Sequence, residues 1–182
     1  MELYGIMESN IKNQHQDKAG CIDFLYFLSL QHFGTVKMRA DLGSTLSYVP
    51  GHDPRRTAHI LQHILANNLG SSLFLERKTY RIVFLRNVSS ISFITGDQPV
   101  INMLDPKTTT HDVELCYPLS PNLAITLMKD STKFPGRERI VNFLEVERYN
   151  YEIYSMSEDQ LYSSDSDYLQ GLAAIGKHAL AS

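Results

Sequence analysis

The chain has 182 residues, 43% hydrophobic and 20% charged, a composition typical of a folded globular protein and not of a disordered one. Its net charge of −3 is spread along the sequence without a basic block, which argues against general nucleic-acid binding and membrane-surface binding. Two cysteines and a most apolar run of ten residues (21–30) exclude a disulfide framework and a membrane-spanning helix, so we expect a cytoplasmic protein with no membrane contact.

Two helices are predicted in the first part of the chain. Apolar side chains occupy most of the circumference of a segment from 18 to about 39, as in a central helix packed on more than one side. A loop is predicted over 43–51. The second helix has Asp53 as N-cap, Pro54 at its first position and Gly70 just past its end.

His59 and His63 lie four residues apart on the second predicted helix and therefore share a face, as the ligands of a metal ion do. No glutamate follows in the zinc-protease arrangement. The sequence favours a solvated or core-capping pair over a ligand pair, so we expect no metal at these two residues.

Short runs of aromatic and β-branched residues predict a small, mainly antiparallel sheet between 72 and 128. The predicted strands are 73–75, 80–85, 91–95, 113–117 and 123–128. Helical spacing returns over 137–155, a capping box at 157–160 predicts a short helix, and a last helix is predicted over 168–180.

This order of elements predicts an α+β fold in one domain, residues 1–182. N-terminal helices (18–70) are expected to pack on the sheet (72–128), and C-terminal helices (137–180) follow.

Asp97 stands at the end of the predicted strand 91–95. Gly96 is free to take a positive φ, and Pro99 cannot donate to a strand ladder, so the two residues stop the strand. Loops at the ends of a sheet concentrate function, which makes Asp97 the first candidate. An Asp here also commonly accepts hydrogen bonds from backbone N–H groups two residues on, and this structural role is favoured.

Polar residues on either side of the loop after Asp97 form the best candidate site. If their strands are hairpin neighbours, six side chains meet at one sheet end: Thr95, Asp97, Asn102, His111, Asp112 and Glu114. Carboxylates beside a histidine can hold a divalent metal or act as acid and base. Catalytic candidates are Asp97, Glu114 and His111; binding candidates are Thr95, Asp97, Asn102 and Asp112.

Other catalytic patterns are weak. Neither cysteine has a basic neighbour in sequence, and Ser120 is not in a nucleophile elbow. The sequence therefore favours a binding or protein-interaction module, with a protein partner or a second copy of the chain as its ligand. The alternative is a metal-dependent hydrolase, phosphoesterase or nuclease-like, with its site around Asp97, and only this alternative needs a divalent metal.

Two motifs resemble those of a known family. Residues 93–100 read FITGDQPV and residues 118–121 read PLSP, with further similarities at Asn142 and, more weakly, at Gln31 and Arg39. Over roughly 18–165 the chain resembles a bacterial family known as domain of unknown function 4238, whose first motif is F-x-T-S-D-x-P-V. The resemblance implies a fold and a candidate site but no activity. Gly96 replaces the family's usual Ser, and members tend to carry an additional segment before the apolar helix.

Overall fold

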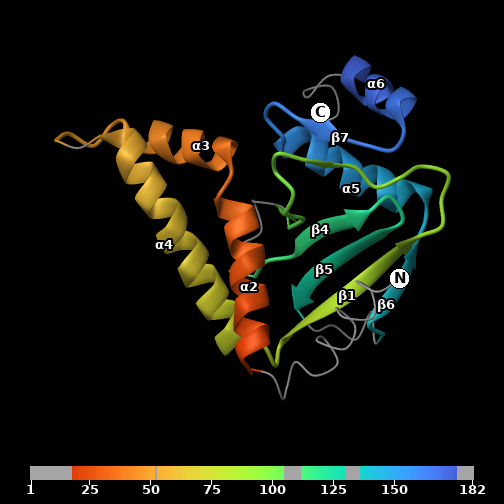
Figure 1. Ribbon diagram of the computed structural model, residues 1–182, viewed down its shortest axis with the longest axis horizontal. Helices are drawn as coiled ribbons and strands as arrows, with labels where there is room; N and C mark the ends of the chain where they lie inside the picture. The colour runs from red at the N-terminus through yellow and green to blue at the C-terminus, as the bar shows by residue number, and fades with distance from the viewer. Residues whose placement is uncertain (1–17, 52, 105–111, 130–135, 176–182) are drawn as a thin grey trace. The chain divides into compact units, whose positions relative to one another are not determined.

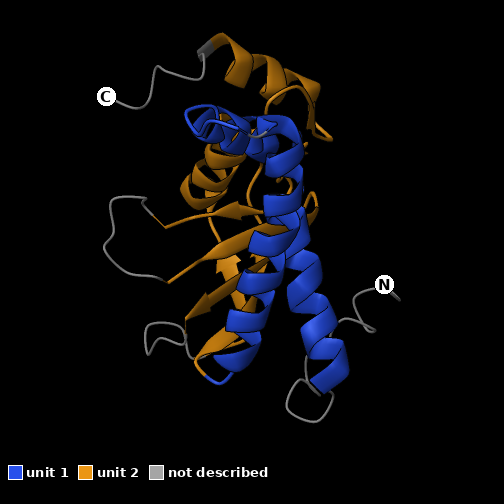
Figure 2. Cartoon of the chain, turned by 90° about the vertical axis from the view of Figure 1, so that its left-hand side faces the viewer, with its two compact units in different colours: residues 1–78 blue, residues 79–182 orange. Residues whose placement is uncertain are grey.

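The computed structural model describes residues 18–51, 53–104, 112–129 and 136–175. The chain divides into two compact units, residues 1–78 and 79–182 (Figure 2). The described part of unit 1 is helical, whereas the described part of unit 2 holds the strands and two further helices, which confirms the α+β class (Figure 1). One domain over 1–182 stays a prediction. None of the helices in the described ranges is long and apolar enough to cross a membrane.

The described part of unit 1 holds three helices where the sequence predicted two. They are α2 (Lys18–Phe33), α3 (Val36–Leu46) and α4 (Pro54–Leu75). The predicted helix from 18 to about 39 is wrong because the chain turns at Gly34 and Thr35. A Cβ on Gly34 would lie 2.6 Å from the Leu30 carbonyl oxygen, and the Thr35 side chain caps α3 by accepting a hydrogen bond from the Met38 N–H at 3.3 Å.

The ends of α3 and α4 also differ from the prediction. The predicted loop 43–51 begins only after Leu46, because α3 continues through Gly43. Asp53 caps α4 as predicted, and its carboxylate accepts hydrogen bonds from the Arg55 and Arg56 N–H groups. Gly70 does not end this helix, and the predicted strand 73–75 forms its last turn.

Gly70 instead allows α2 and α4 to pack closely. A Cβ at Gly70 would lie 3.2 Å from the Tyr26 Cα atom, so any larger residue would push the two helices apart. The buried residues of α4 form one stripe: Ala58, Gln62, Ala66, Gly70 and Leu73. The stripe is made largely of small residues, so it does not stand out as an apolar pattern in the sequence.

Unit 2 is built on a five-stranded sheet of order β3-β4-β5-β1-β6. Its strands are β1 (Tyr80–Asn87), β3 (Ile101–Asn102), β4 (Leu115–Ser120), β5 (Leu123–Lys129) and β6 (Glu138–Val141). The pairs are antiparallel except β1 with β6, so the mainly antiparallel sheet is confirmed. A separate antiparallel pair joins β2 (Thr95–Gly96) to β7 (Leu161–Tyr162).

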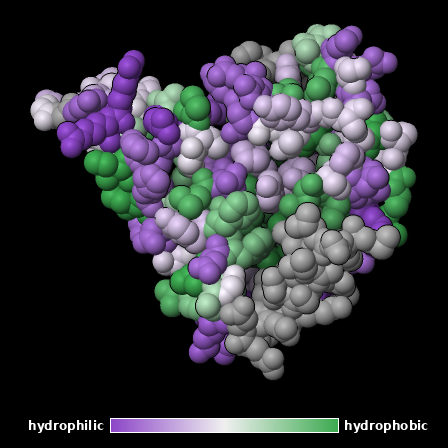
Figure 3. Space-filling model, in the orientation of Figure 1, coloured by the Kyte–Doolittle hydropathy of each residue, from purple (hydrophilic) through white to green (hydrophobic). Residues whose placement is uncertain are grey.

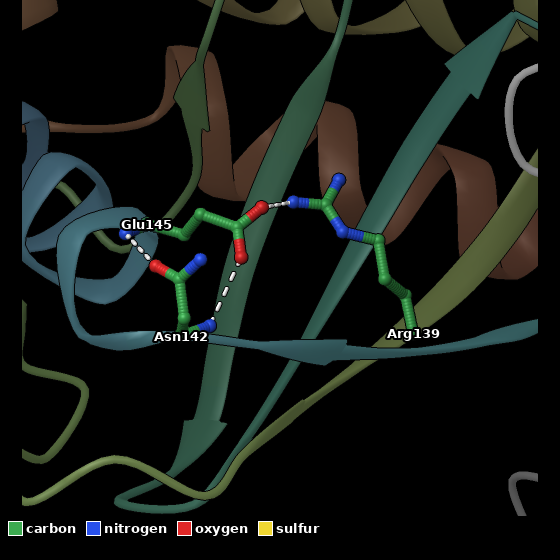
Figure 4. Close-up of polar contacts among 3 residues, drawn as sticks. All are labelled: Arg139, Asn142 and Glu145. Carbon is green, nitrogen blue, oxygen red and sulfur yellow. Dashed lines mark hydrogen bonds and ion pairs between the residues drawn. The ribbon is translucent and has the colours of Figure 1, made fainter.

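The predicted helix 137–155 divides into β6 and α5 (Phe143–Met156). Asn142 lies between them as the N-cap of α5, not inside a helix as the sequence predicted. Its Oδ1 accepts the Glu145 N–H at 3.1 Å, and Glu145 Oε2 accepts the Asn142 N–H at 2.9 Å (Figure 4). The Arg139 guanidinium pairs with the same Glu145 carboxylate, which ties the end of β6 to the start of α5.

The capping-box pattern at 157–160 opens no helix. These residues form the connection between α5 and β7, and the last described helix is α6 (Ser166–Ile175). The core of unit 2 lies between the sheet, the segment before β2 and α5, with contributions such as Val83, Leu85, Phe93, Val146 and Ile153.

Candidate functional site

The segment before β2 is buried without being part of a sheet. Phe93 and Ile94 are 3% and 1% exposed, yet the predicted strand 91–95 is reduced to the two residues of β2. Asn150 of α5, itself fully buried, replaces the missing strand. Its Oδ1 accepts the Ile94 N–H at 3.0 Å, and its Nδ2 donates to the Ser92 carbonyl oxygen at 2.8 Å. One side chain thus satisfies one buried and one partly buried backbone group.

The segment 118–121 meets this buried segment. The Phe93 N–H donates to the Pro121 carbonyl oxygen at 2.9 Å, and the same oxygen accepts a hydrogen bond from Asn87 Nδ2 at 3.2 Å. Pro118 interrupts the regular register of β4, because the pairing with β5 shifts between Pro118 and Ser120. The two motif segments, 93–95 and 118–121, therefore lie side by side.

A cavity of about 280 Å³ opens where these segments meet the chain that follows β7. We call it the motif pocket. It is lined by Phe93, Ile94, Thr95, Pro118, Leu119, Ser120, Pro121, Tyr162, Ser163 and Ser164. Half of these residues carry a hydroxyl group and the rest are apolar. The lining includes no Asp, Glu, His, Lys, Arg or Cys, so the wall is neutral near pH 7.

The hydroxyl groups of the motif pocket differ in their partners. Ser164 Oγ donates to Ser92 Oγ at 2.9 Å, the Tyr162 hydroxyl donates to Gln160 Oε1 at 2.5 Å, and Ser163 Oγ accepts the Asp165 N–H at 3.0 Å. Among the described residues, no hydrogen bond occupies the Thr95 or Ser120 hydroxyl. These two groups, one from each motif, are available to a ligand.

A protein-family model described as "Protein of unknown function (DUF4238)" matches residues 11–167, which is most of the chain. The chain belongs to this family. Comparison with curated proteins and comparison with solved structures each found no match. Both motif segments fall inside the matched range, so the motif pocket is the candidate site of this DUF4238 member.

Asp97 lies just after the pocket-lining part of the first motif and makes a structural contact. Its Oδ1 accepts the Glu158 N–H at 3.0 Å and its Oδ2 accepts the Asp159 N–H at 2.7 Å, while its own N–H donates to the Gln160 carbonyl oxygen. These donors come from the turn before β7, about sixty residues further along the chain, and not from the loop that contains Asp97. The carboxylate therefore fixes the β2–β7 pair.

The pKa of the Asp97 carboxyl reflects two opposing effects. Partial burial raises the pKa, and the backbone hydrogen bonds from Asp159 and Glu158 lower it; the hydrogen bonds win, so the pKa lies below its ordinary value. A carboxylate held in this way is a poor general base and is already engaged at both oxygens.

The other predicted site residues do not gather around Asp97. Asn102 and Glu114 do meet, because Asn102 Oδ1 accepts the Glu114 N–H at 3.0 Å. Asp112 forms an ion pair with Lys129 at 2.7 Å, and Thr95 belongs to the motif pocket. His111 lies outside the described residues. Within the described ranges, no three His, Cys, Asp or Glu side chains are placed to hold a metal together.

His59 and His63 share a face of α4, as the sequence predicted. Their ring centroids are 5.1 Å apart with an interplanar angle of 57°, and both side chains are exposed. No third ligand side chain joins them in the part of the chain that the structure describes.

Sequence reasoning missed Asn150 and the lining residues 162–164. Asn150 did carry a signal, because an asparagine inside an amphipathic helix is disfavoured unless its amide has a specific partner. The serines had no such signal, since their role depends on the pairing of β2 with β7.

Replacing Asp97 should test its structural role. Asp97→Ala should lower the free energy of unfolding by about 1–3 kcal/mol, because two N–H groups lose a charged acceptor. Asp97→Asn should lower it nearly as much, since its new NH₂ group would face an N–H donor. Both values are measured by urea denaturation.

The effect should depend on pH with a definite sign. Because the folded-state pKa is depressed, the stabilisation is complete above the ordinary carboxyl pKa of about 3.9 and is lost as the pH falls through the folded value. The stability difference between the native protein and Asp97→Ala should therefore shrink in acid. A difference that is the same at pH 7 and in acid would contradict this role.

Proposed function

We propose that this protein is a binding module and that its second unit binds a ligand in the motif pocket. The observation that carries the proposal is the meeting of the two motif segments, 93–95 and 118–121, at one concave surface. Its cavity of about 280 Å³ is at the small end of ligand sites. This size suits a single side chain or a short peptide group better than a large cofactor.

The chemistry of the wall indicates what the pocket accepts. Phe93, Pro118 and Leu119 provide apolar contact, whereas the Thr95 and Ser120 hydroxyls can each donate and accept one hydrogen bond. A charged group would lose its hydration without gaining a countercharge among the lining residues. We therefore propose that the pocket holds an uncharged polar group, such as an amide, presented by a protein partner.

Binding is favoured over catalysis because no lining residue can activate a nucleophile. Ser120 and Thr95 would need an adjacent general base, and the lining provides neither a histidine nor a carboxylate nor a lysine. The pocket is thus suited to recognition.

The experiment is an NMR titration of the full chain with N-methylacetamide and short Asn- or Gln-containing peptides, using acetate as the charged control. We expect backbone shifts at 93–95, 118–121 and 162–164 with the amides and not with acetate. Thr95→Val and Ser120→Ala should each weaken binding by about tenfold, the equivalent of one good hydrogen bond. Ser90→Ala, an exposed serine outside the pocket, is the matched control. Equal shifts with acetate, or unchanged binding in both variants, would overturn the proposal.

The alternative remains a metal-dependent hydrolase centred on Asp97. It is the second candidate, because the Asp97 carboxylate already accepts two backbone N–H groups and Asp112 pairs with Lys129. A ligand that binds only the native state raises its melting temperature. A rise with manganese or magnesium in the native protein that disappears in Asp97→Asn would favour the hydrolase.

A further inference from the structure

Unit 1 contains a second and larger cavity, of about 770 Å³, between α3 and the start of α4. We call it the basic groove. Its lining includes three arginines, Arg39, Arg55 and Arg56, together with the apolar residues Val36, Ala40 and Pro54. Hydrophilic residues gather over the same part of unit 1 in the space-filling view (Figure 3). The groove combines three permanent positive charges with a wall that can bury an apolar group.

Neighbouring acids offset only part of the positive charge of the groove, because its lining holds three arginines and one carboxylate. Asp53 is the one acidic residue in its lining, and the Asp53 carboxylate accepts hydrogen bonds from the backbone N–H groups of Arg55 and Arg56 at 3.0 and 3.3 Å. Among the described residues, none of the three guanidinium groups forms an ion pair with a carboxylate. Such an arrangement attracts an anion.

Arg39 is held in position by a buried amide. Its Nε donates to Gln62 Oε1 at 3.0 Å, and Gln62 is only 2% exposed. Gln62 Nε2 in turn donates to the carbonyl oxygens of Phe33 and Thr35 at 2.6 and 2.8 Å. This chain of hydrogen bonds holds the guanidinium at Nε, and no described residue forms a hydrogen bond with Nη1 or Nη2, so these two groups can bind a ligand. A guanidinium fixed in this way loses little entropy when it binds a phosphate with two parallel hydrogen bonds.

The charge, the volume and the apolar lining residues of the basic groove together indicate the class of ligand. Arg55 and Arg56 lie in the first turn of α4, where the helix dipole also favours negative charge. The cavity volume is that of a site for a drug-sized molecule, larger than a lone phosphate needs. We propose that the basic groove binds a nucleoside phosphate, with its phosphates on the three arginines and its base against Val36, Ala40 and Pro54. This site is independent of the motif pocket.

The test is isothermal titration of the full chain with ATP, with adenosine and tripolyphosphate as partial probes. We expect ATP to bind and both partial probes to bind at least about tenfold more weakly, because each lacks one set of contacts. Arg39→Gln and the double variant Arg55→Gln/Arg56→Gln should each weaken ATP binding by about tenfold or more. Added salt should weaken it as well.

The control is Arg148→Gln, which removes an exposed arginine of α5 and should leave ATP binding unchanged. Arg55 and Arg56 are exposed, so their double variant should fold normally even if Arg39→Gln disturbs Gln62. No heat on titration with ATP, or ATP binding equal in the double variant and the native protein, would overturn the proposal. Tripolyphosphate binding as tightly as ATP would also overturn it, because the base contact would then be absent.

Discussion

Asn150→Ala should lower the free energy of unfolding by about 2–6 kcal/mol, since one buried and one partly buried backbone group lose their Asn150 partner at about 1–3 kcal/mol each. The groups are the Ile94 N–H and the Ser92 carbonyl, and neither Ser92 nor Ile94 belongs to a strand. Urea denaturation of the purified variant gives the value directly. The motif pocket should be affected too, because Ile94 forms part of its wall.

Asn142→Ala is the matched control. Asn142 is also on α5, but it is an exposed N-cap, and its removal should lower the free energy of unfolding by only about 1 kcal/mol. If Asn150→Ala were no more destabilising than Asn142→Ala, the buried segment 92–94 would not depend on the Asn150 amide.

Gly96→Ala should be the second damaging change, lowering the free energy of unfolding by about 1–3 kcal/mol, as overpacking of a tight site does. The new Cβ would lie 2.2 Å from Ser157 Oγ and 2.7 Å from the Gln160 carbonyl oxygen. The carbonyl cannot move away freely, because it accepts the Asp97 N–H at 3.1 Å. Thermal melts at neutral pH are sufficient to measure the loss.

Gly171→Ala provides the opposite result as a control. Nothing lies within 4 Å of a Cβ at Gly171 on the exposed side of α6, so alanine should stabilise the protein by about 0.5–1 kcal/mol.

Adding Ser157→Ala to Gly96→Ala should restore only part of the loss, because the Gln160 carbonyl remains. Full recovery of stability in this double variant would mean that the clash with the Ser157 hydroxyl alone causes the loss.

The sequence predicted those elements that are set by local patterns. β1 and β5 follow runs of aromatic and β-branched residues, and α4 begins where Asp53 and Pro54 indicate. Errors arose where tertiary contacts decide. Gly70 reads as a helix end but serves helix packing. Residues 138–141 have helical spacing, but they form strand β6, which pairs with β1. Ile140 of this strand is 65% exposed.

The motif pocket could be anticipated from the sequence only in part, again because local patterns do not determine tertiary contacts. Both motifs were recognisable in the sequence, and Thr95 of the first motif lines the motif pocket. That residues 118–121 and 162–164 would join it could not be deduced, because the contacts depend on the β2–β7 pair and on the Asn150 side chain. The predicted carboxylate cluster assumed that 91–95 pairs as a hairpin with the strand near 114, whereas the buried segment pairs with no strand there.

The parallel pairing of β1 with β6 has a consequence for the order of folding. Phe84 is aligned with Glu138, so this edge of the sheet cannot form until more than fifty intervening residues have been gathered. The helices of unit 1, in contrast, are joined by short connections and meet their neighbours early. Loop closure over a long distance slows folding. In a stopped-flow refolding experiment, the helical signal of unit 1 should therefore recover before the slow phase in which β6 docks, and that phase limits the rate at which the whole chain becomes native.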